Sequence, residues 1–345
     1  MANPILVELT RGRWVESRYR GAVAIADASG RLVWSAGDVD RPVFGRSALK
    51  MLQALTLIET GAAEAFDVAP EELALACASH GGEPFHVQAV AAWLKRIGCD
   101  ESDLACGAHA PANEAAARAL LLEGRPPSRL HNNCSGKHTG FLTVARLLGV
   151  VPSGYERPDH PVQRLVLAAI AEMAGLDRAS MPVAIDGCTA PAAATPLRGL
   201  AVAMARIADP SGLSPSRAKA AGRLYAAVRA HPLYVAGTGR ACTAIIEAAD
   251  GAASVKTGAE GAYVAVVGRL GLGVALKIDD GAGRAAETVI AAILVGLGVV
   301  DRDHPAIAAL VDAKVVDTTG RVVGARRPSS WLAAELRGAL ADIAG

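Results

Sequence analysis

A serine and a lysine three residues apart form the first pair in this chain with the types and spacing needed for covalent chemistry. Ser47 and Lys50 follow the turn Phe44-Gly45-Arg46 and lead into the apolar run 51–58. If that run is helical, residues three apart share a face, so the hydroxyl and the amine lie together at the helix start. A lysine can take the serine's proton only if its pKa falls by about three units. The alternative is a helix cap beside a surface lysine.

A second group, Lys256-Thr257-Gly258, stands before an apolar strand late in the chain. The small residues after the lysine leave room for a substrate, and its charge can lower the pKa of another lysine. Ser-x-x-Lys followed by Lys-Thr-Gly resembles the signature pair of the serine β-lactamases and penicillin-binding proteins. Their Ser-Asp-Asn is absent. In its place, Ser79 in the loop 77–82 is either a second serine paired with Lys256 or part of a capping turn.

Two polar stretches contain further reactive side chains. Residues 131–140 are dense in Asn, His, Cys and Lys ahead of an apolar helix, where backbone N–H groups and side-chain donors gather. Residues 184–191 form a short apolar strand that ends in Asp186 and Cys188. Cys134 and Cys188 could be half of a zinc site, but no Cys-x-x-Cys or His-x-x-x-His accompanies them. Spacing alone therefore favours two buried thiols.

Composition limits the class of ligand. The chain has 345 residues, 52% hydrophobic, with a formal net charge of +1, so it carries no electrostatic signature of nucleic-acid or anionic-membrane binding. A small neutral ligand fits better. The longest apolar run, 288–300, is too short to cross a bilayer, and the start does not read as a secretory signal, so we expect a cytoplasmic protein. Six cysteines in such a chain do not indicate a disulfide framework.

The elements that must position these residues follow from the apolar periodicity. Residues 21–27 and 31–35, with a turn at 28–30, predict an antiparallel hairpin. Helical spacing recurs in the middle of the chain, at residues 85–97, 113–123, 139–148, 160–173 and 214–229. Strands return at 261–268 and 272–278, before a helix at 283–297. The pattern predicts one α/β (α+β) domain, with an antiparallel sheet from both chain ends (about 1–45 and 236–345) and an inserted, mainly helical region (about 46–235).

Taken together, the motifs resemble those of the Rhizobium etli-type (class 3) L-asparaginases, over nearly the whole chain. The motifs that carry the resemblance are, in order, Arg46-Ser47-Ala48-Leu49-Lys50, Ala78-Ser79-His80-Gly81-Gly82, the stretch 131–138, Asp186-Gly187-Cys188 and the stretch 256–261. The resemblance implies a fold like those of serine β-lactamases and glutaminases, and usually a homodimer. It implies hydrolysis of L-asparagine to L-aspartate and ammonia, an amidohydrolase reaction on a linear amide.

The resemblance also implies roles for individual residues. Two catalytic Ser-Lys pairs correspond to Ser47 with Lys50 and Ser79 with Lys256. An unusual zinc (Zn2+) site corresponds to Cys134, Lys137 and Cys188. The substrate pocket corresponds to Arg46, His138 and Asp186. Two thiolates and a neutral amine suit tetrahedral zinc and leave a fourth position open. Two rival functions remain, a β-lactam-acylating serine enzyme and a non-catalytic zinc-dependent amino-acid-binding protein.

Overall fold

The computed structural model describes residues 2–338 and divides into two compact units. The sheet unit comprises Met1–Ala48, Thr195–Gly212 and Ala244–Gly345, and the helical unit comprises Leu49–Ala194 and Leu213–Thr243. Residues 195–212, which we assigned to the inserted helical region, group with the sheet because their helix packs on its strands. The expectation of a single domain stays a prediction.

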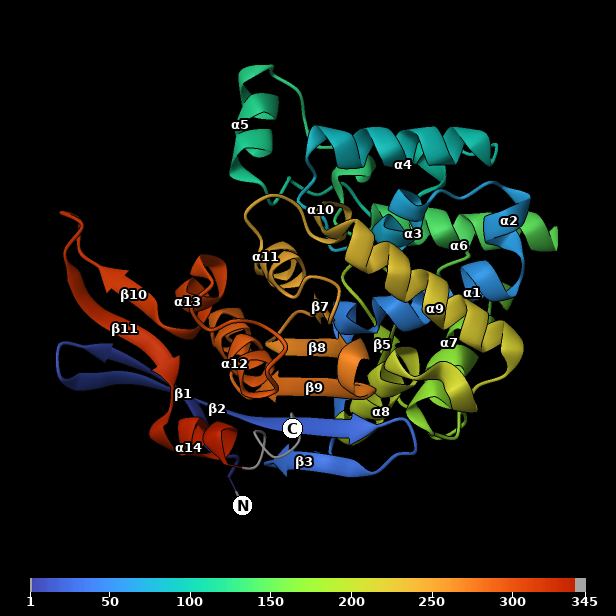
Figure 1. Cartoon of the computed structure of the whole chain (residues 1–345). Helices are drawn as coiled ribbons and strands as arrows, with labels where there is room; N and C mark the ends of the chain where they lie inside the picture. The colour runs from blue at the N-terminus through green and yellow to red at the C-terminus, as the bar shows by residue number, and fades with distance from the viewer. Residues whose placement is uncertain (1, 339–345) are drawn as a thin grey trace. The chain divides into compact units, whose positions relative to one another are not determined.

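An eight-stranded sheet forms the centre of the sheet unit, in the order β10-β11-β1-β2-β9-β8-β7, with β3 beside β2. Its strands are β1 (Ile5–Arg11), β2 (Trp14–Asp27), β3 (Leu32–Ala36), β7 (Ser254–Thr257), β8 (Ala262–Val267), β9 (Leu272–Ile278), β10 (Ala313–Val316) and β11 (Val322–Pro328). All the pairs are antiparallel. Figure 1 shows β7, β8, β9, β2 and β3 as one row of strands. The predicted antiparallel sheet from both chain ends is confirmed.

Two long helices pack on this sheet, α8 (Leu197–Ala208) and α12 (Gly283–Gly296). Every residue of β8 is buried, so both faces of the sheet are covered at that strand. The apolar run 288–300 forms most of α12, as its sequence predicts. Within residues 2–338, no helix has both the length and the apolar character that spanning a membrane requires. The remaining elements of the sheet unit are β4 (Pro42–Phe44), α13 (Pro305–Val311) and α14 (Ser330–Arg337).

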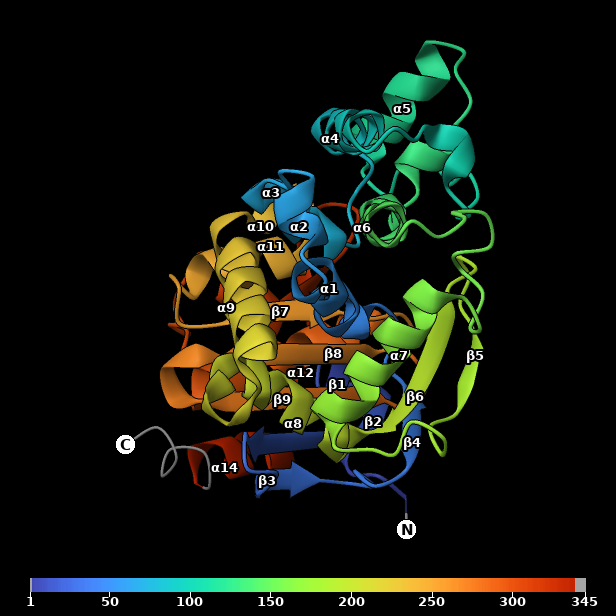
Figure 2. The same cartoon turned by 90° about the vertical axis from the view of Figure 1, so that its right-hand side faces the viewer.

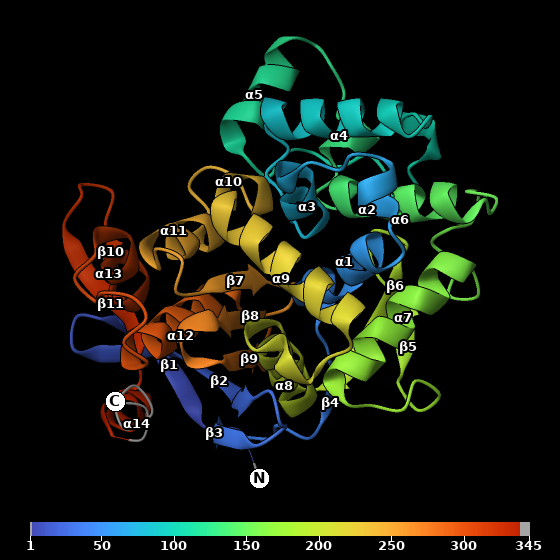
Figure 3. The same ribbon diagram turned by 45° about the vertical axis from the view of Figure 1, so that its right-hand side comes forward.

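The helical unit carries most of the helices that the periodicity predicts. They are α4 (Pro84–Arg96), α5 (Glu114–Leu122), α6 (Ser135–Leu148), α7 (Pro161–Ala174) and α9 (Pro215–Ala230). The further elements are α1 (Lys50–Glu59), α2 (Ala62–Ala65), α3 (Pro70–Ala76), β5 (Val183–Ile185), β6 (Pro191–Pro196) and α10 (Pro232–Val235). Helix α11 (Ala241–Ala248) begins in the helical unit, and its residues from Ala244 on belong to the sheet unit. Figure 3 shows α4 beside α6, and Figure 2 shows β5 paired with β6.

Candidate active site

Ser47 lies in a tight turn, not in the α-helix that we predicted to begin there. Residues Arg46–Leu49 form a single 3-10 turn directly before α1, with the Ala48 N–H donating to the Gly45 carbonyl at 3.0 Å. Arg46 has a φ of +51°, in the left-handed region that side chains rarely adopt. Such backbone strain costs roughly 1–3 kcal/mol and persists where surrounding structure enforces it, often at functional sites.

The strand that carries Lys256 lies against this turn. A Cβ atom placed on Gly258 would come within 2.5 Å of the Gly45 carbonyl oxygen and 3.2 Å of the Ala48 nitrogen. Only a glycine at position 258 therefore lets this strand come so close to the backbone of Gly45 and Ala48. Lys256 itself is 2% exposed, and its Nζ donates to the Thr257 carbonyl at 2.8 Å. Ser47 and the Lys-Thr-Gly strand, far apart in the sequence, thus belong to adjoining segments of the sheet unit.

Replacing Gly258 with alanine should disturb this approach. We expect Gly258→Ala to lower the free energy of unfolding by about 1–3 kcal/mol, because the new methyl group overlaps the Gly45 carbonyl. Denaturant titration would measure the change. Gly283→Ala is the matched control, since a Cβ there meets no atom within 4 Å. Equal stability of the two variants would contradict the predicted overlap.

Lys50 is buried, and its amine is directly bonded to Ser79. Its Nζ donates to the Ser79 hydroxyl at 3.1 Å, to the Asn133 carbonyl at 3.4 Å and, over a shorter contact, to the Ala78 carbonyl. The structure therefore links Lys50 to the second candidate serine, a contact that the motif spacing does not reveal.

The loop that carries Ser79 is held from two sides. The Ser79 N–H donates to the Val235 carbonyl at 2.9 Å, and the His80 N–H donates to the Asn133 carbonyl at 3.3 Å. His80 Nε2 lies 2.9 Å from the hydroxyl of Ser135, the first residue of α6. The loop is therefore fixed to the helix start that carries the candidate metal ligands.

His80 and His86 form a buried stacked pair, with ring centroids 4.8 Å apart and an interplanar angle of 18°. His80 Nδ1 accepts from the Gly82 N–H, and His86 Nε2 lies 2.9 Å from the Leu233 carbonyl. Burial lowers the pKa of both rings, and a charge on His86 would lower the pKa of His80 further. Both rings are therefore neutral in the folded protein at neutral pH.

This pair makes folding acid-sensitive. The unfolded histidines bind protons near pH 6.5, whereas the folded rings with lowered pKa do not, so stability falls as pH drops below about 6.5. Each histidine contributes up to about 1.4 kcal/mol per pH unit. We expect His80→Gln to lose less stability than the parent between pH 7.5 and pH 5.5, measured as the free energy of unfolding in urea titrations. An unchanged slope in His80→Gln would refute this assignment.

Cys134, Lys137 and Cys188 converge at the start of α6. Cys134 is the N-cap of this helix, Lys137 lies in its first turn, and Cys188 follows β5. Lys137 Nζ is 3.0 Å from Cys188 Sγ, and the two thiols are within hydrogen-bonding reach of each other. All three side chains are buried. The structure thus brings together the residues that the resemblance assigns to zinc.

The charges in this cluster are strongly coupled. The hydrogen bond from Cys188 holds the pKa of Cys134 well below its usual range, helped by the charges of Lys50 and Lys137. The same hydrogen bond, together with burial, raises the pKa of Cys188. Burial lowers the pKa of Lys137, but the charges of Cys134 and Cys188 outweigh burial and raise it. By themselves these side chains therefore favour a Cys134 thiolate beside a Lys137 ammonium.

The donor set fits zinc only with the lysine included. Two sulfurs and one nitrogen in a buried site are the soft and borderline donors that zinc prefers. Among residues 2–338, no group of three or more His, Cys, Asp or Glu side chains is placed to hold a metal ion. A metal at Cys134 and Cys188 would therefore depend on a deprotonated Lys137 as its third protein ligand.

His138 and Asp186 adjoin this cluster. His138 is fully buried, and its Nδ1 lies 2.6 Å from the hydroxyl of Tyr155. Asp186 is half-buried, accepts from the Gly187 N–H at 2.6 Å, and helps to raise the pKa of Lys137. Tyr155 was not predicted from the sequence. An aromatic residue in the loop after Pro152-Ser153-Gly154, in a chain with only 4% aromatic residues, was the available signal.

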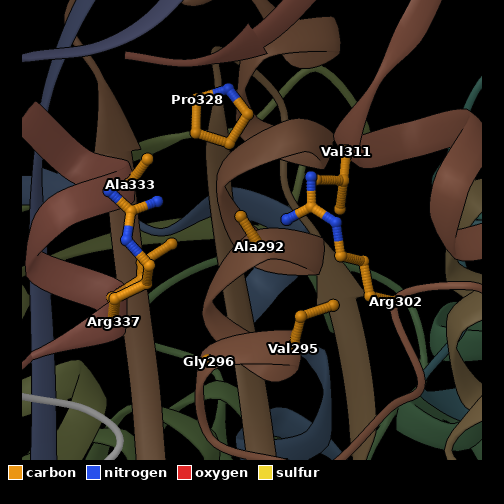
Figure 4. Close-up of a pocket in the computed structure, with 9 residues that line it drawn as sticks. Ala292, Val295, Gly296, Arg302, Val311, Pro328, Ala333 and Arg337 are labelled. Atoms are coloured by element: carbon orange, nitrogen blue, oxygen red, sulfur yellow. The ribbon is translucent and has the colours of Figure 1, made fainter. Parts of the chain in front are cut away.

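A separate cavity of about 240 Å³ lies in the sheet unit between α12, β11 and α14. Figure 4 shows Arg302 and Arg337 on either side of Ala292, with their guanidinium groups turned toward each other over an apolar floor. None of the predicted site residues lines this cavity. It is therefore distinct from the groups that carry the catalytic motifs.

Two solved structures are similar to this chain. A β-lactamase from Mycobacterium bovis is 17% identical, with a TM-score of 0.42, over 80% of this chain and 94% of that chain. A protein provisionally described as a β-lactamase from Bacteroides dorei is 15% identical, with a TM-score of 0.41, over 76% of this chain and 87% of that chain. A search of the curated proteins finds no match.

One protein-family model matches nearly the whole chain. The model described as L-asparaginase II matches residues 7–328, which include every site residue predicted from the sequence. The match spans both units and the motifs in each of them. This chain therefore belongs to the L-asparaginase II family.

Proposed function

We propose that this protein hydrolyses L-asparagine to L-aspartate and ammonia. The observation that carries the proposal is the buried hydrogen bond from Lys50 to Ser79, in a chain of the L-asparaginase II family. A buried lysine bonded to a serine is the arrangement that moves a proton to or from a hydroxyl nucleophile.

The mechanism we propose is acyl transfer with Ser47 as the nucleophile. Its Oγ bonds to the carbon of the substrate's side-chain amide, and its proton passes to the lysine and serine set of Lys50, Ser79 and Lys256. That proton then moves to the amide nitrogen, which leaves as ammonia. Water attacks the resulting ester, regenerating the Ser47 hydroxyl and releasing aspartate. The approach of Gly258 to the Ser47 turn and the Lys50–Ser79 bond support this assignment.

We also propose that Cys134, Lys137 and Cys188 hold a zinc ion. When bound, zinc supplies a coordination point for the amino-acid end of the substrate. The convergence of the three side chains supports the proposal. Lys137 must give up its proton to become a ligand, and its raised pKa makes binding compete with protonation. Arg46, His138 and Asp186 would then line the substrate pocket.

The decisive experiment measures ammonia release from L-asparagine and, in parallel, from L-glutamine. We expect turnover of asparagine and weaker turnover of glutamine, because exclusion of one methylene discriminates by about 1–3 kcal/mol. A chromogenic cephalosporin assay tests the β-lactam alternative. Asparagine binding without ammonia release would instead support the zinc-dependent binding protein and refute the proposed function.

Two further properties remain to be tested, of which the first rests on the same family resemblance. We propose a homodimer and a cytoplasmic location. Light scattering on the purified protein tests the first, with twice the mass of the 35.2 kDa chain expected. Cell fractionation tests the second.

A further inference from the structure

A buried hydrogen-bond chain ends at His138. The backbone N–H of Ala105 donates to the Tyr155 hydroxyl at 2.9 Å, and this hydroxyl lies 2.6 Å from His138 Nδ1. Tyr155 is 1% exposed and His138 is 0% exposed, so water does not compete for these bonds. The hydrogen bond from Ala105 uses one lone pair of the Tyr155 phenolic oxygen. The hydroxyl proton of Tyr155 is still free to form a second hydrogen bond, in which it is the donor.

The position of that proton fixes the tautomer of His138. If the hydroxyl donates to Nδ1, the Tyr155 O–H and the Nδ1 lone pair satisfy each other, and the ring proton lies on Nε2. If Nδ1 donates instead, the Tyr155 O–H loses its acceptor in a buried site, which is unfavourable.

The other nitrogen of the same ring has no protein partner. His138 Nε2 is buried and makes no hydrogen bond with any described residue. The ring follows Lys137 in α6 and responds to the charges of Lys137 and Lys50, so it adjoins the zinc and Ser-Lys groups. A buried N–H without a partner is costly and suggests a ligand that completes it.

We propose that Tyr155 is a positioning residue that holds His138 as the Nε2–H tautomer, so that His138 donates a hydrogen bond to an oxygen of the substrate. This inference rests on the proposed function for the identity of the substrate. It assigns His138 a donor role and excludes it from metal ligation, because a zinc-bound imidazole nitrogen carries no proton.

The direct test is the tautomer of His138 in the native protein. Long-range proton–nitrogen NMR of protein with ¹⁵N-labelled histidine separates protonated from unprotonated ring nitrogens, and loss of one set of signals in His138→Gln assigns them. We expect Nε2 to be protonated and Nδ1 to be unprotonated. A proton on Nδ1 would overturn the proposal whether or not the protein hydrolyses asparagine.

The kinetic test uses Tyr155→Phe, which removes only the hydroxyl. We expect kcat/KM for L-asparagine to fall about tenfold and the His138 signals to show a mixture of tautomers. The glutamine amide of His138→Gln is a donor that does not depend on Tyr155. When Tyr155→Phe is added to His138→Gln, kcat/KM should therefore fall by less than about twofold. Equal losses in both backgrounds would show that Tyr155 does not act through His138.

Tyr234→Phe is the matched control, because it removes a phenolic hydroxyl elsewhere in the helical unit and should leave kcat/KM and the His138 signals unchanged. If Tyr155→Phe fails to fold, the tautomer in the native protein still decides the proposal. If the native protein releases no ammonia from asparagine, the proposed function fails, whereas the tautomer result separately decides the role of Tyr155.

Discussion

Ser47→Ala is expected to lower kcat for asparagine hydrolysis by about 10⁴-fold or more, the largest effect of any substitution considered. Without the Ser47 hydroxyl, the lysines have no nucleophile to activate and no acyl-enzyme can form. Only the rate enhancement from substrate binding and transition-state stabilisation remains. The Ser47 turn precedes α1 and is exposed enough to reach a ligand, so the loss of one hydroxyl should not unfold the protein. Ammonia release under saturating asparagine measures the change.

The control for Ser47→Ala is Ser216→Ala, an equivalent change on the exposed face of α9, which should retain the parent's rate. Thermal unfolding of both variants should match that of the parent. Turnover within about tenfold of the parent in Ser47→Ala would remove Ser47 from the nucleophile's role. Ser79 would then be the first alternative, because it already bonds to Lys50.

Cys188→Ser is expected to abolish stoichiometric zinc binding. The substitution replaces a soft thiol by a hydroxyl in a site that has only two sulfurs and one amine. Elemental analysis after dialysis against a weak chelator measures zinc per chain. Cys99→Ser, a thiol of the same unit outside the cluster, is the control and should keep its metal. Equal zinc content in the two variants would rule out Cys188 as a ligand.

The pH dependence of zinc binding tests the lysine ligand. The neighbouring sulfurs raise the pKa of Lys137, so the ammonium form predominates at neutral pH and zinc must displace its proton. Cys188, whose pKa is also raised, must lose a proton too, so affinity should fall about a hundredfold for each pH unit of acidification if Lys137 is a ligand and only about tenfold if it is not. Competition with a chromogenic chelator at pH 8 and pH 7 measures the change. A fall of only about tenfold for each pH unit would exclude Lys137 as a ligand.

The fold was predictable because its elements are long and strongly periodic. The β2–β3 hairpin and helix α12 match the predicted segments to within a residue or so at most ends. The start of α6 was not predicted, because Ser135, Gly136, His138 and Thr139 are poor helix formers. Tertiary packing overrides that preference: a Cβ on Gly136 would lie 2.4 Å from the Leu75 carbonyl, so glycine lets α6 approach α3.

The site was predictable only in part. The family resemblance, and not the spacing, assigned Cys134, Lys137 and Cys188 to one site, and the structure places them together. The resemblance also put Lys50 and Ser79 in one catalytic set, which agrees with the bond between them. Helix spacing alone could not give that bond, because it predicts the neighbours of a side chain on its own helix but not the loop that it meets. Tyr155 was missed for the same reason, since it reaches His138 from a loop that carries no motif.

The pairing of β1 with β11 has a consequence for synthesis in the cell. Val7 lies opposite Pro328, so β1 is synthesised long before β11, the strand that covers its outer edge. Chains that stop before residue 322 would present that edge to solvent and to one another, which favours aggregation. Early termination products should therefore appear in inclusion bodies, and chaperones should associate with nascent β1 until β11 has been synthesised.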